Sequence, residues 1–181
     1  MSLAASLALS PHFTAGELGA DAPTASAAVV GNLRAVAAYL EQVRAVLGVP
    51  LRVTSGYRSP ADNLAVGGAP SSDHPYGLAV DFVPVGLSQF TAHDKLTAAR
   101  ASGELPAWDQ LIFYPVEGHI HVGLGARRRG EVRVKLAEGS LAPLTASLVA
   151  TLRGAVSGTS AGLLALVVLA FLFLVVLPGL P

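Results

Sequence analysis

The chain contains no cysteine. Disulfides, thiolate nucleophiles, iron–sulfur clusters and cysteine-bound zinc are therefore excluded, and any metal ion must be held by histidine and carboxylate side chains. Charged residues are also scarce, at 13% of 181 positions, and the 12 Lys and Arg balance the 12 Asp and Glu. A chain without a basic excess is not typical of nucleic-acid-binding proteins, so we expect no nucleic-acid partner. The apolar content of 52% excludes an intrinsically disordered chain.

The longest uncharged stretch is at the C-terminal end, where residues 161–181 read AGLLALVVLAFLFLVVLPGLP. Its unbroken apolar part is close to the shortest length that crosses a bilayer. A buried core helix normally keeps one polar face, and this segment has none. The pattern therefore favours a transmembrane or membrane-anchoring helix, or a segment that packs against an apolar assembly partner. Residues 137–160, rich in Ala, Ser, Thr and Gly, are interpreted as a linker with weak helical character.

Hydrophobic spacing predicts a mixed α+β domain over residues 1–136. Apolar residues at helical spacing predict a helix over residues 32–47, and a second helix is predicted over residues 91–101. A segment rich in Gly, Ser and Pro predicts a loop over residues 55–72. Short strands are predicted at residues 51–54, 78–83, 110–114, 119–124 and 131–136. The mixed order and the hairpin-length gaps favour a small antiparallel sheet with flanking helices.

Histidines provide the candidate metal ligands. His119 and His121 are two residues apart on a predicted strand, so both imidazoles point to the same face. Between His74 and Asp81, Gly77 permits a turn, after which a predicted strand delivers the carboxylate. Two histidines, one carboxylate and a water molecule form the open tetrahedral site that catalytic zinc prefers. A histidine pair on one strand is more often a surface or core feature, so the spacing alone leaves both interpretations open.

Two segments, TSGYRSPADNLAVGGAPSSDHPYGLAVDF and WDQLIFYPVEGHIHVGL, resemble a known family. They are similar to the zinc D-Ala-D-Ala carboxypeptidases and the phage L-alanyl-D-glutamate endolysins, whose fold is shared by the signalling domain of hedgehog proteins. The SGYRS loop of that family is complete at residues 55–59, and the resemblance extends over residues 9–125. The family motif S-x-H-x(2)-G-x-A-x-D is complete at Ser72, His74, Gly77, Ala79 and Asp81.

The resemblance implies a single zinc ion bound by His74, Asp81 and His121. Many relatives have glutamate three residues before the last zinc ligand, but here that residue is Gly118. Glu117 lies one residue further from His121. Relatives that end in H-x-H place the first histidine close to the metal. His119 is therefore our first candidate for proton transfer or oxyanion stabilisation. Glu117 is the second candidate, either as the base or as the carboxylate that orients His119, since on a strand it shares a face with both histidines.

By the same resemblance, Arg58 grips a carboxylate or carbonyl group of the substrate, a role that suits the planar fork of a guanidinium. A salt bridge that braces the loop is the structural alternative for Arg58. Ser72 is expected to hydrogen-bond the substrate near the metal, or else to cap a turn. Tyr57 is expected to pack in the loop and to line the cleft. Asp73 and Asp109 are interpreted as turn or cap residues.

The activity that the resemblance implies is zinc-dependent hydrolysis of peptidoglycan stem peptides. The enzyme would be either a D-Ala-D-Ala carboxypeptidase or an L-Ala-D-Glu-type endopeptidase. The alternative is a non-catalytic zinc-binding structural or binding module, anchored by its apolar tail. The expected partners are the stem peptide and, for residues 161–181, a membrane or an apolar assembly partner.

The expected location is membrane-associated, at the cell envelope. Basic residues precede the apolar tail and none follows it, so the positive-inside rule places the main domain on the cytoplasmic side. Peptidoglycan lies outside that membrane, and the N-terminus lacks the basic and apolar segments of a secretory signal. Three routes would reconcile these observations: release of the domain at lysis, its arrival from outside on a phage particle, or an inverted insertion of the tail. A phage-encoded or virion-associated enzyme fits the family and the missing signal.

Overall fold

The computed structural model describes residues 3–135, 141–145 and 147–151. The apolar segment 161–181, where a C-terminal helix is predicted, lies outside the described residues. Most of the predicted linker 137–160 lies outside them as well. Among the residues that are described, no helix is both long enough and apolar enough to cross a membrane.

The helices begin and end where capping residues favour their termini. Helix α2 starts earlier than the predicted residue 32, because the Ser26 side chain accepts the N–H of Val29 and caps the first turn. Helix α3 lies inside the predicted loop 55–72, with Ser59 as its cap and a proline in its first turn. The helical elements are α1 (Ala15–Leu18), α2 (Ala27–Leu47), α3 (Pro60–Ala65), the 3-10 turn η1 (His74–Tyr76) and α4 (Gln89–Ser102).

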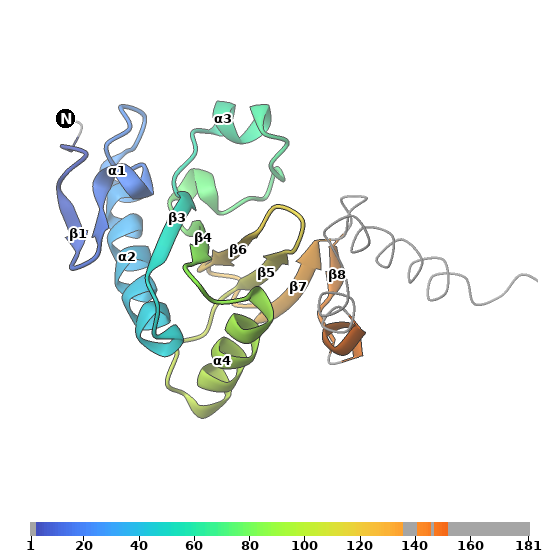
Figure 1. Ribbon diagram of the computed structural model, residues 1–181. Coiled ribbons are helices and arrows are strands. Elements are labelled where there is room, and N and C mark those ends of the chain that lie inside the picture. Colours follow the sequence, from blue (N-terminus) through green and yellow to red (C-terminus); the bar gives the residue numbers. More distant parts are fainter. Residues whose placement is uncertain (1–2, 136–140, 146, 152–181) are drawn as a thin grey trace, which may run out of the picture.

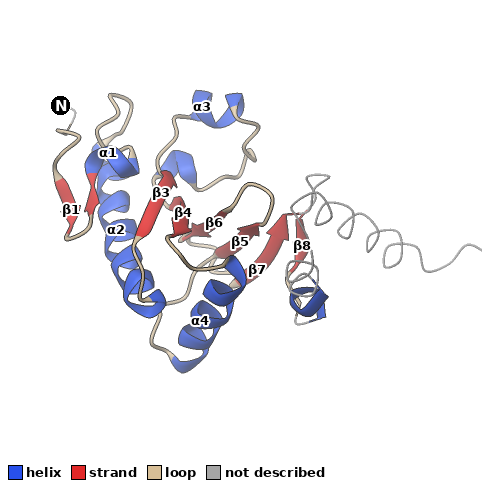
Figure 2. Ribbon diagram, viewed as in Figure 1, coloured by secondary structure: helices blue, strands red, loops and turns tan. Residues whose placement is uncertain are grey.

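The strands form one small ribbon and one larger sheet (Figure 2). The strands are β1 (Ala8–Ser10), β2 (Phe13–Thr14), β3 (Leu51–Ser55), β4 (Ala79–Pro84), β5 (Gln110–Tyr114), β6 (His119–Gly123), β7 (Glu131–Lys135) and β8 (Leu141–Pro143). The ribbon pairs β1 with β2, and the larger sheet has the order β3-β4-β6-β5-β7-β8. The mixed α+β class is confirmed, and strands β3 to β7 lie at the predicted positions. Strand β8 comes from the stretch interpreted as a linker.

The sequence led us to expect an antiparallel sheet. The larger sheet departs from this expectation, because β5 and β7 run parallel. The hairpin between β5 and β6 explains this pairing. Strand β6 returns to the end of β5 where Gln110 lies, and Gln110 pairs with both Gly123 at the end of β6 and Glu131 at the start of β7. Residues 124–130 therefore only have to cross the end of β5, and no long crossover connection is needed.

The hydrophobic core lies between the larger sheet and helices α2 and α4. Figure 1 shows α2 beside β3 and α4 below the sheet, with the segment that carries α3 above β3 and β4. The apolar stripe predicted for α2 is buried, namely Leu33, Val36, Leu40, Val43 and Leu47. On the central strands, alternate residues enter the same core, namely Val80, Phe82, Leu111, Phe113, Ile120 and Val122. The residues between them point to the opposite face of the sheet.

Candidate metal centre and pocket

Strand alternation places Asp81 and His121 on the face of the sheet opposite the core. The residues directly before and after Asp81 on β4, and those directly before and after His121 on β6, have side chains buried in the core. The two strands are antiparallel, and Asp81 and His121 are direct register partners. Side chains that oppose each other on one face of a sheet lie close together, so the carboxylate and the imidazole meet.

His74 reaches the same point from the turn η1, which precedes β4. The turn ends at Gly77, whose φ of 67° lies in the left-handed region that glycine adopts without steric cost. A Cβ at this position would also come within 2.8 Å of the Val29 carbonyl oxygen on α2. Glycine is therefore required here both for the reversal of the chain and for the close approach to the helix.

The three side chains bring one donor atom each to a common point, and we call them the metal cluster. His121 Nδ1 lies 2.8 Å from Asp81 Oδ1 and 3.2 Å from His74 Nε2. His74 Nε2 lies 3.3 Å from the same carboxylate oxygen. Two ligand atoms at a tetrahedral zinc ion are about 3.3 Å apart, given bond lengths of about 2.0–2.1 Å. The donor set and its spacing therefore fit a zinc ion.

The protonation of the metal cluster is set by its neighbours. The Gly56 carbonyl oxygen lies 2.6 Å from His74 Nδ1 and can only accept a hydrogen bond, so Nδ1 is the donor and Nε2 is the ring nitrogen that faces the cluster. Burial raises the pKa of Asp81, but hydrogen bonds from His121 and His74 outweigh burial, and the net pKa is well below its ordinary value. Asp81 is therefore a carboxylate, the form that binds a metal ion.

The metal cluster lines a pocket of about 440 Å³. Arg58 also lines this pocket, with its Nη1 atom 3.9 Å from Asp81 Oδ2 and about a quarter of its side chain exposed. At that separation the guanidinium does not form a close bidentate pair with Asp81. Its Nε atom is buried and has no hydrogen-bond partner among the described residues. Arg58 therefore retains donors that a ligand in the pocket could use.

The chain matches the family model of peptidase M15 over residues 11–123. The chain belongs to the M15 family. This family comprises zinc peptidases similar to the D-Ala-D-Ala carboxypeptidases and endolysins, so the resemblance stated from the motifs is confirmed. The matched residues include the whole metal cluster and Arg58, and they end at the last residue of β6. A search of the curated proteins finds no match to this chain.

Two further residues of the M15 motifs occupy different surroundings. Ser72 lines the pocket, and its Oγ accepts the backbone N–H of His74 at 3.3 Å. Both of its expected roles, turn capping and substrate contact, are compatible with that position. Tyr57 instead donates its hydroxyl hydrogen to the Thr24 carbonyl at 3.0 Å, and its backbone N–H bonds the Leu18 carbonyl. Tyr57 thus ties the loop to the N-terminal segment, and its contact with substrate stays a prediction.

His119 lines the pocket from the first position of β6. Its ring stacks on the ring of Tyr114, with centroids 4.3 Å apart and an interplanar angle of 18°. Burial lowers the pKa of His119, and this effect outweighs the nearby negative charges of Asp81 and Glu117, which raise it. The imidazole is therefore neutral at neutral pH and has a lone pair that can accept a proton.

Glu117 lies in the turn between β5 and β6, and not on the strand, so the expected strand face shared with His119 and His121 is wrong. The turn closes where the N–H of Gly118 donates to the Tyr114 carbonyl at 2.8 Å, and Gly118 has a φ of 79°. Glu117 nevertheless lines the pocket, with its Oε1 atom 3.8 Å from Lys135 Nζ. Its role as a base or as an orienting carboxylate stays a prediction.

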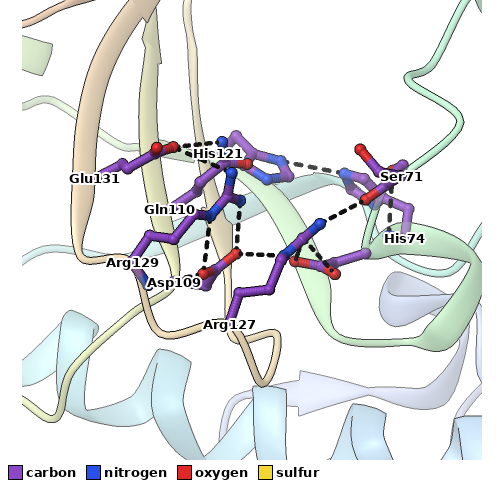
Figure 3. A network of polar contacts seen from close by, with 10 residues as sticks. Ser71, His74, Asp109, Gln110, His121, Arg127, Arg129 and Glu131 are labelled. Carbon is purple, nitrogen blue, oxygen red and sulfur yellow. Dashed lines mark hydrogen bonds and ion pairs between the residues drawn. The ribbon is translucent and has the colours of Figure 1, made fainter.

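Sequence reasoning missed a second cluster at the pocket, consisting of Asp73, Asp109, Arg127 and Arg129. We call it the arginine clamp. Asp73 and the two arginines line the pocket, and Figure 3 shows Asp109 between Arg127 and Arg129. The two aspartates were expected to be turn or cap residues. Asp73 is the N-cap residue of η1, although its side chain makes no cap bond, and both carboxylates are ion-paired to the arginines, which was not expected. The sequence contains one signal for this pairing, because buried carboxylates need cationic partners and three consecutive arginines follow β6.

Proposed function

We propose that the protein is a zinc-dependent peptidase that hydrolyses the stem peptides of peptidoglycan. The observation that carries the proposal is the convergence of His74 Nε2, Asp81 Oδ1 and His121 Nδ1 beside a pocket that holds Arg58. Membership of the M15 family supports a metallopeptidase. The choice of peptidoglycan as substrate, and of a D-Ala-D-Ala or an L-Ala-D-Glu bond within it, rests on the resemblance of the motifs.

In this mechanism His74, Asp81 and His121 would hold one zinc ion, which would supply a Lewis acid for the scissile carbonyl and a lower pKa for the attacking water. Arg58 binds a carboxylate or carbonyl of the peptide through its unpaired donors and thereby orients it. A ring nitrogen of His119 accepts the proton of the attacking water and returns it to the leaving amine. Ser72 hydrogen-bonds the peptide beside the metal cluster.

The proposal is tested by incubating the zinc-loaded protein with defined muropeptides, one ending in D-Ala-D-Ala and one carrying an intact L-Ala-D-Glu bond. Mass spectrometry of the products identifies the bond that is cut. We expect release from one of the two substrates, and we expect a chelator to abolish it. The His121→Ala variant is the control for contaminating peptidases. A zinc-loaded protein that binds the muropeptides and releases nothing would overturn the peptidase and favour the non-catalytic binding module.

The location at the membrane is a separate part of the proposal and is supported only by the apolar sequence of residues 161–181. The tail would hold the peptidase domain at the envelope, near its substrate. Membrane pelleting of the full chain tests this, with Leu166→Arg as the variant, because an arginine in the middle of a membrane helix is costly. We expect the variant to move into the supernatant, whereas unchanged pelleting would contradict anchoring by this segment.

A further inference from the structure

Arg127 links its own segment to two other segments of the chain beside the metal cluster (Figure 3). Its Nη2 atom donates to both carboxylate oxygens of Asp73, each at 2.9 Å. Its Nη1 atom donates to the backbone carbonyl of Ser71 at 3.3 Å, and its Nε atom donates to Asp109 Oδ2 at 3.3 Å. One guanidinium thus links the residues that lead into His74 to the end of the sheet.

The sheet end of this link is fixed. The Asp109 side chain is fully buried, and Arg129 binds it side-on, with Nε 3.1 Å from Oδ1 and Nη2 2.7 Å from Oδ2. The backbone of Asp109 is held as well, because its N–H bonds the carbonyl of Gly123 and its carbonyl accepts the N–H of Glu131. Asp109 is therefore anchored to the end of β6 and the start of β7, and Arg127 has a rigid support.

The Asp73 carboxylate is fitted against two glycines. A Cβ on Gly125 would lie 2.6 Å from Asp73 Oδ2, and a Cβ on Gly123 would lie 3.1 Å from the same atom. Neither glycine has a positive φ, so the left-handed conformation does not explain either of them. Because both residues are glycine, the Asp73 carboxylate has space to lie against them. This fit supports a specific position for Asp73 and is independent of its contacts with Arg127.

Asp73 is also the base of the turn that presents the metal ligand. Its backbone carbonyl accepts the N–H groups of Tyr76 and Leu78, both at 3.1 Å, and it directly precedes His74. On the other side, His74 Nδ1 is held by the carbonyl of Gly56. The imidazole is therefore located by two supports, one on the ring and one on the backbone that carries it.

We infer that Arg127 is a positioning residue for the metal site: by clamping Asp73 to Asp109, it holds His74 Nε2 beside the other two donor atoms. A ligand that is already in place binds a metal ion more tightly, because less conformational entropy is lost on binding. The two arginines of the clamp lie outside the family match, which covers residues 11–123, whereas its two aspartates lie inside it. The inference rests on the zinc site of the proposed function and deepens it.

A direct contact with substrate is the competing role for Arg127, because the residue lines the pocket and 41% of its side chain is exposed. All three nitrogens of its guanidinium, however, already donate to protein oxygens. Arg58 differs, since its one ion pair is long and its Nε atom has no partner among the described residues. The contacts therefore favour Arg58 for binding substrate and Arg127 for positioning His74.

The test measures zinc affinity by competition with a chelating dye, and it records the visible spectrum of the cobalt-substituted protein, without any peptide substrate. The variants are Arg127→Gln, Arg127→Lys and Gly125→Ala. We expect Arg127→Gln to weaken the zinc Kd by about 10–100-fold, as the loss of an outer support of a metal ligand does, and to alter the cobalt spectrum. Gly125→Ala should act in the same direction, because its Cβ displaces the Asp73 carboxylate.

Two controls separate positioning from general loss of stability. Arg128→Gln removes the same charge from the same segment at an exposed residue outside the pocket, and should leave the Kd within about twofold. Leu96→Ala opens a cavity in the core under α4 and lowers the Tm, yet should keep the wild-type cobalt spectrum. If Arg127→Gln does not fold, Arg127→Lys decides the question, because it keeps the charge but not the fork that spans the three segments.

A wild-type Kd and cobalt spectrum in Arg127→Gln, or in Arg127→Lys where only that variant folds, would overturn the inference. The outcome is independent of catalysis. A wild-type protein that binds zinc but cleaves no peptide removes the proposed peptidase and leaves the comparison of Kd values intact. Conversely, if the enzyme is active and its Arg127 variants bind zinc normally, the positioning role of Arg127 is refuted and the proposed peptidase stands.

Discussion

The metal cluster and the arginine clamp lie at one pocket, yet they balance charge in opposite ways. In the clamp, two carboxylates meet two guanidiniums at 2.7–3.3 Å, so each charge faces an opposite charge. In the metal cluster, a carboxylate and two imidazole nitrogens converge, and the nearest guanidinium, that of Arg58, stays 3.9 Å away. The first arrangement is balanced in itself, whereas the second has the donor set that a cation would complete. This is the difference expected between a supporting cluster and a binding one.

The largest effect is expected from Asp81→Asn, which removes the carboxylate charge of the metal cluster while keeping its shape. An amide is a much weaker zinc ligand than a carboxylate. We expect the zinc content after dialysis against a weak chelator to fall from one ion per chain to near zero, with loss of peptide hydrolysis. Elemental analysis measures this, and Glu104→Gln, an exposed residue, is the matched control. Full retention of zinc by Asp81→Asn would show that Asp81 is not a ligand.

The next effect separates the two candidate bases, which lie in the same pocket but in different settings. We expect His119→Ala to lower kcat by about 10²–10⁴-fold while zinc content is unchanged, because a positioned proton acceptor is lost. Glu117→Gln is expected to lower kcat less than about tenfold, since that carboxylate is in an exposed turn and pairs with Lys135. Steady-state kinetics with matched zinc loading gives both values. The reverse order would assign the base to Glu117.

A third prediction concerns the pH dependence of the arginine clamp. The hydrogen bonds from Arg129 hold the pKa of Asp109 below its ordinary value, against the opposing effect of burial. The stabilisation is thus fully present above the unfolded-state pKa of about 4 and is lost as the pH falls toward the lower folded-state pKa. We expect Asp109→Asn to lower the free energy of unfolding by about 1–3 kcal/mol at neutral pH.

Urea denaturation of both proteins between neutral and acidic pH measures this difference, and it should shrink on acidification. A difference that stays constant down to pH 3 would show that the charge of Asp109 contributes nothing to the clamp. The same experiment at high salt should change little, because Asp109 is buried and poorly screened.

The smallest effect is expected for the ion pair between Lys135 and Glu117, which lies in the pocket but belongs to neither cluster. Both side chains are at least a third exposed, and the charged atoms are 3.8 Å apart. Exposed pairs of this kind contribute at most about 1 kcal/mol. Lys135→Met should therefore change the free energy of unfolding by less than that amount, as measured by denaturation at neutral pH. A larger loss would place Lys135 in a cooperative network with the arginine clamp.

Much of the scaffold was predictable because its signals are local. The apolar stripe on α2 follows from side chains at helical spacing, and the positions of β3 to β7 follow from short alternating runs. The same alternation puts Asp81 and His121 on one face and their neighbours in the core. The early start of α2 and the short helix α3 were missed because each depends on a single serine cap within a segment that has no apolar stripe.

The sequence by itself determined which kinds of side chain could bind a metal: without cysteine these are histidine and carboxylate, and the resemblance to the family predicts His74, Asp81 and His121 as the ligands. Only the tertiary structure decided what supports them. Arg127 is 54 residues from Asp73 and 18 from Asp109, so no local pattern links these residues. Their contact exists because β7 pairs parallel to β5, which carries residues 124–130 across the end of the sheet. Long-range strand pairing places charges together, and it is the part of the fold that periodicity along the chain does not encode.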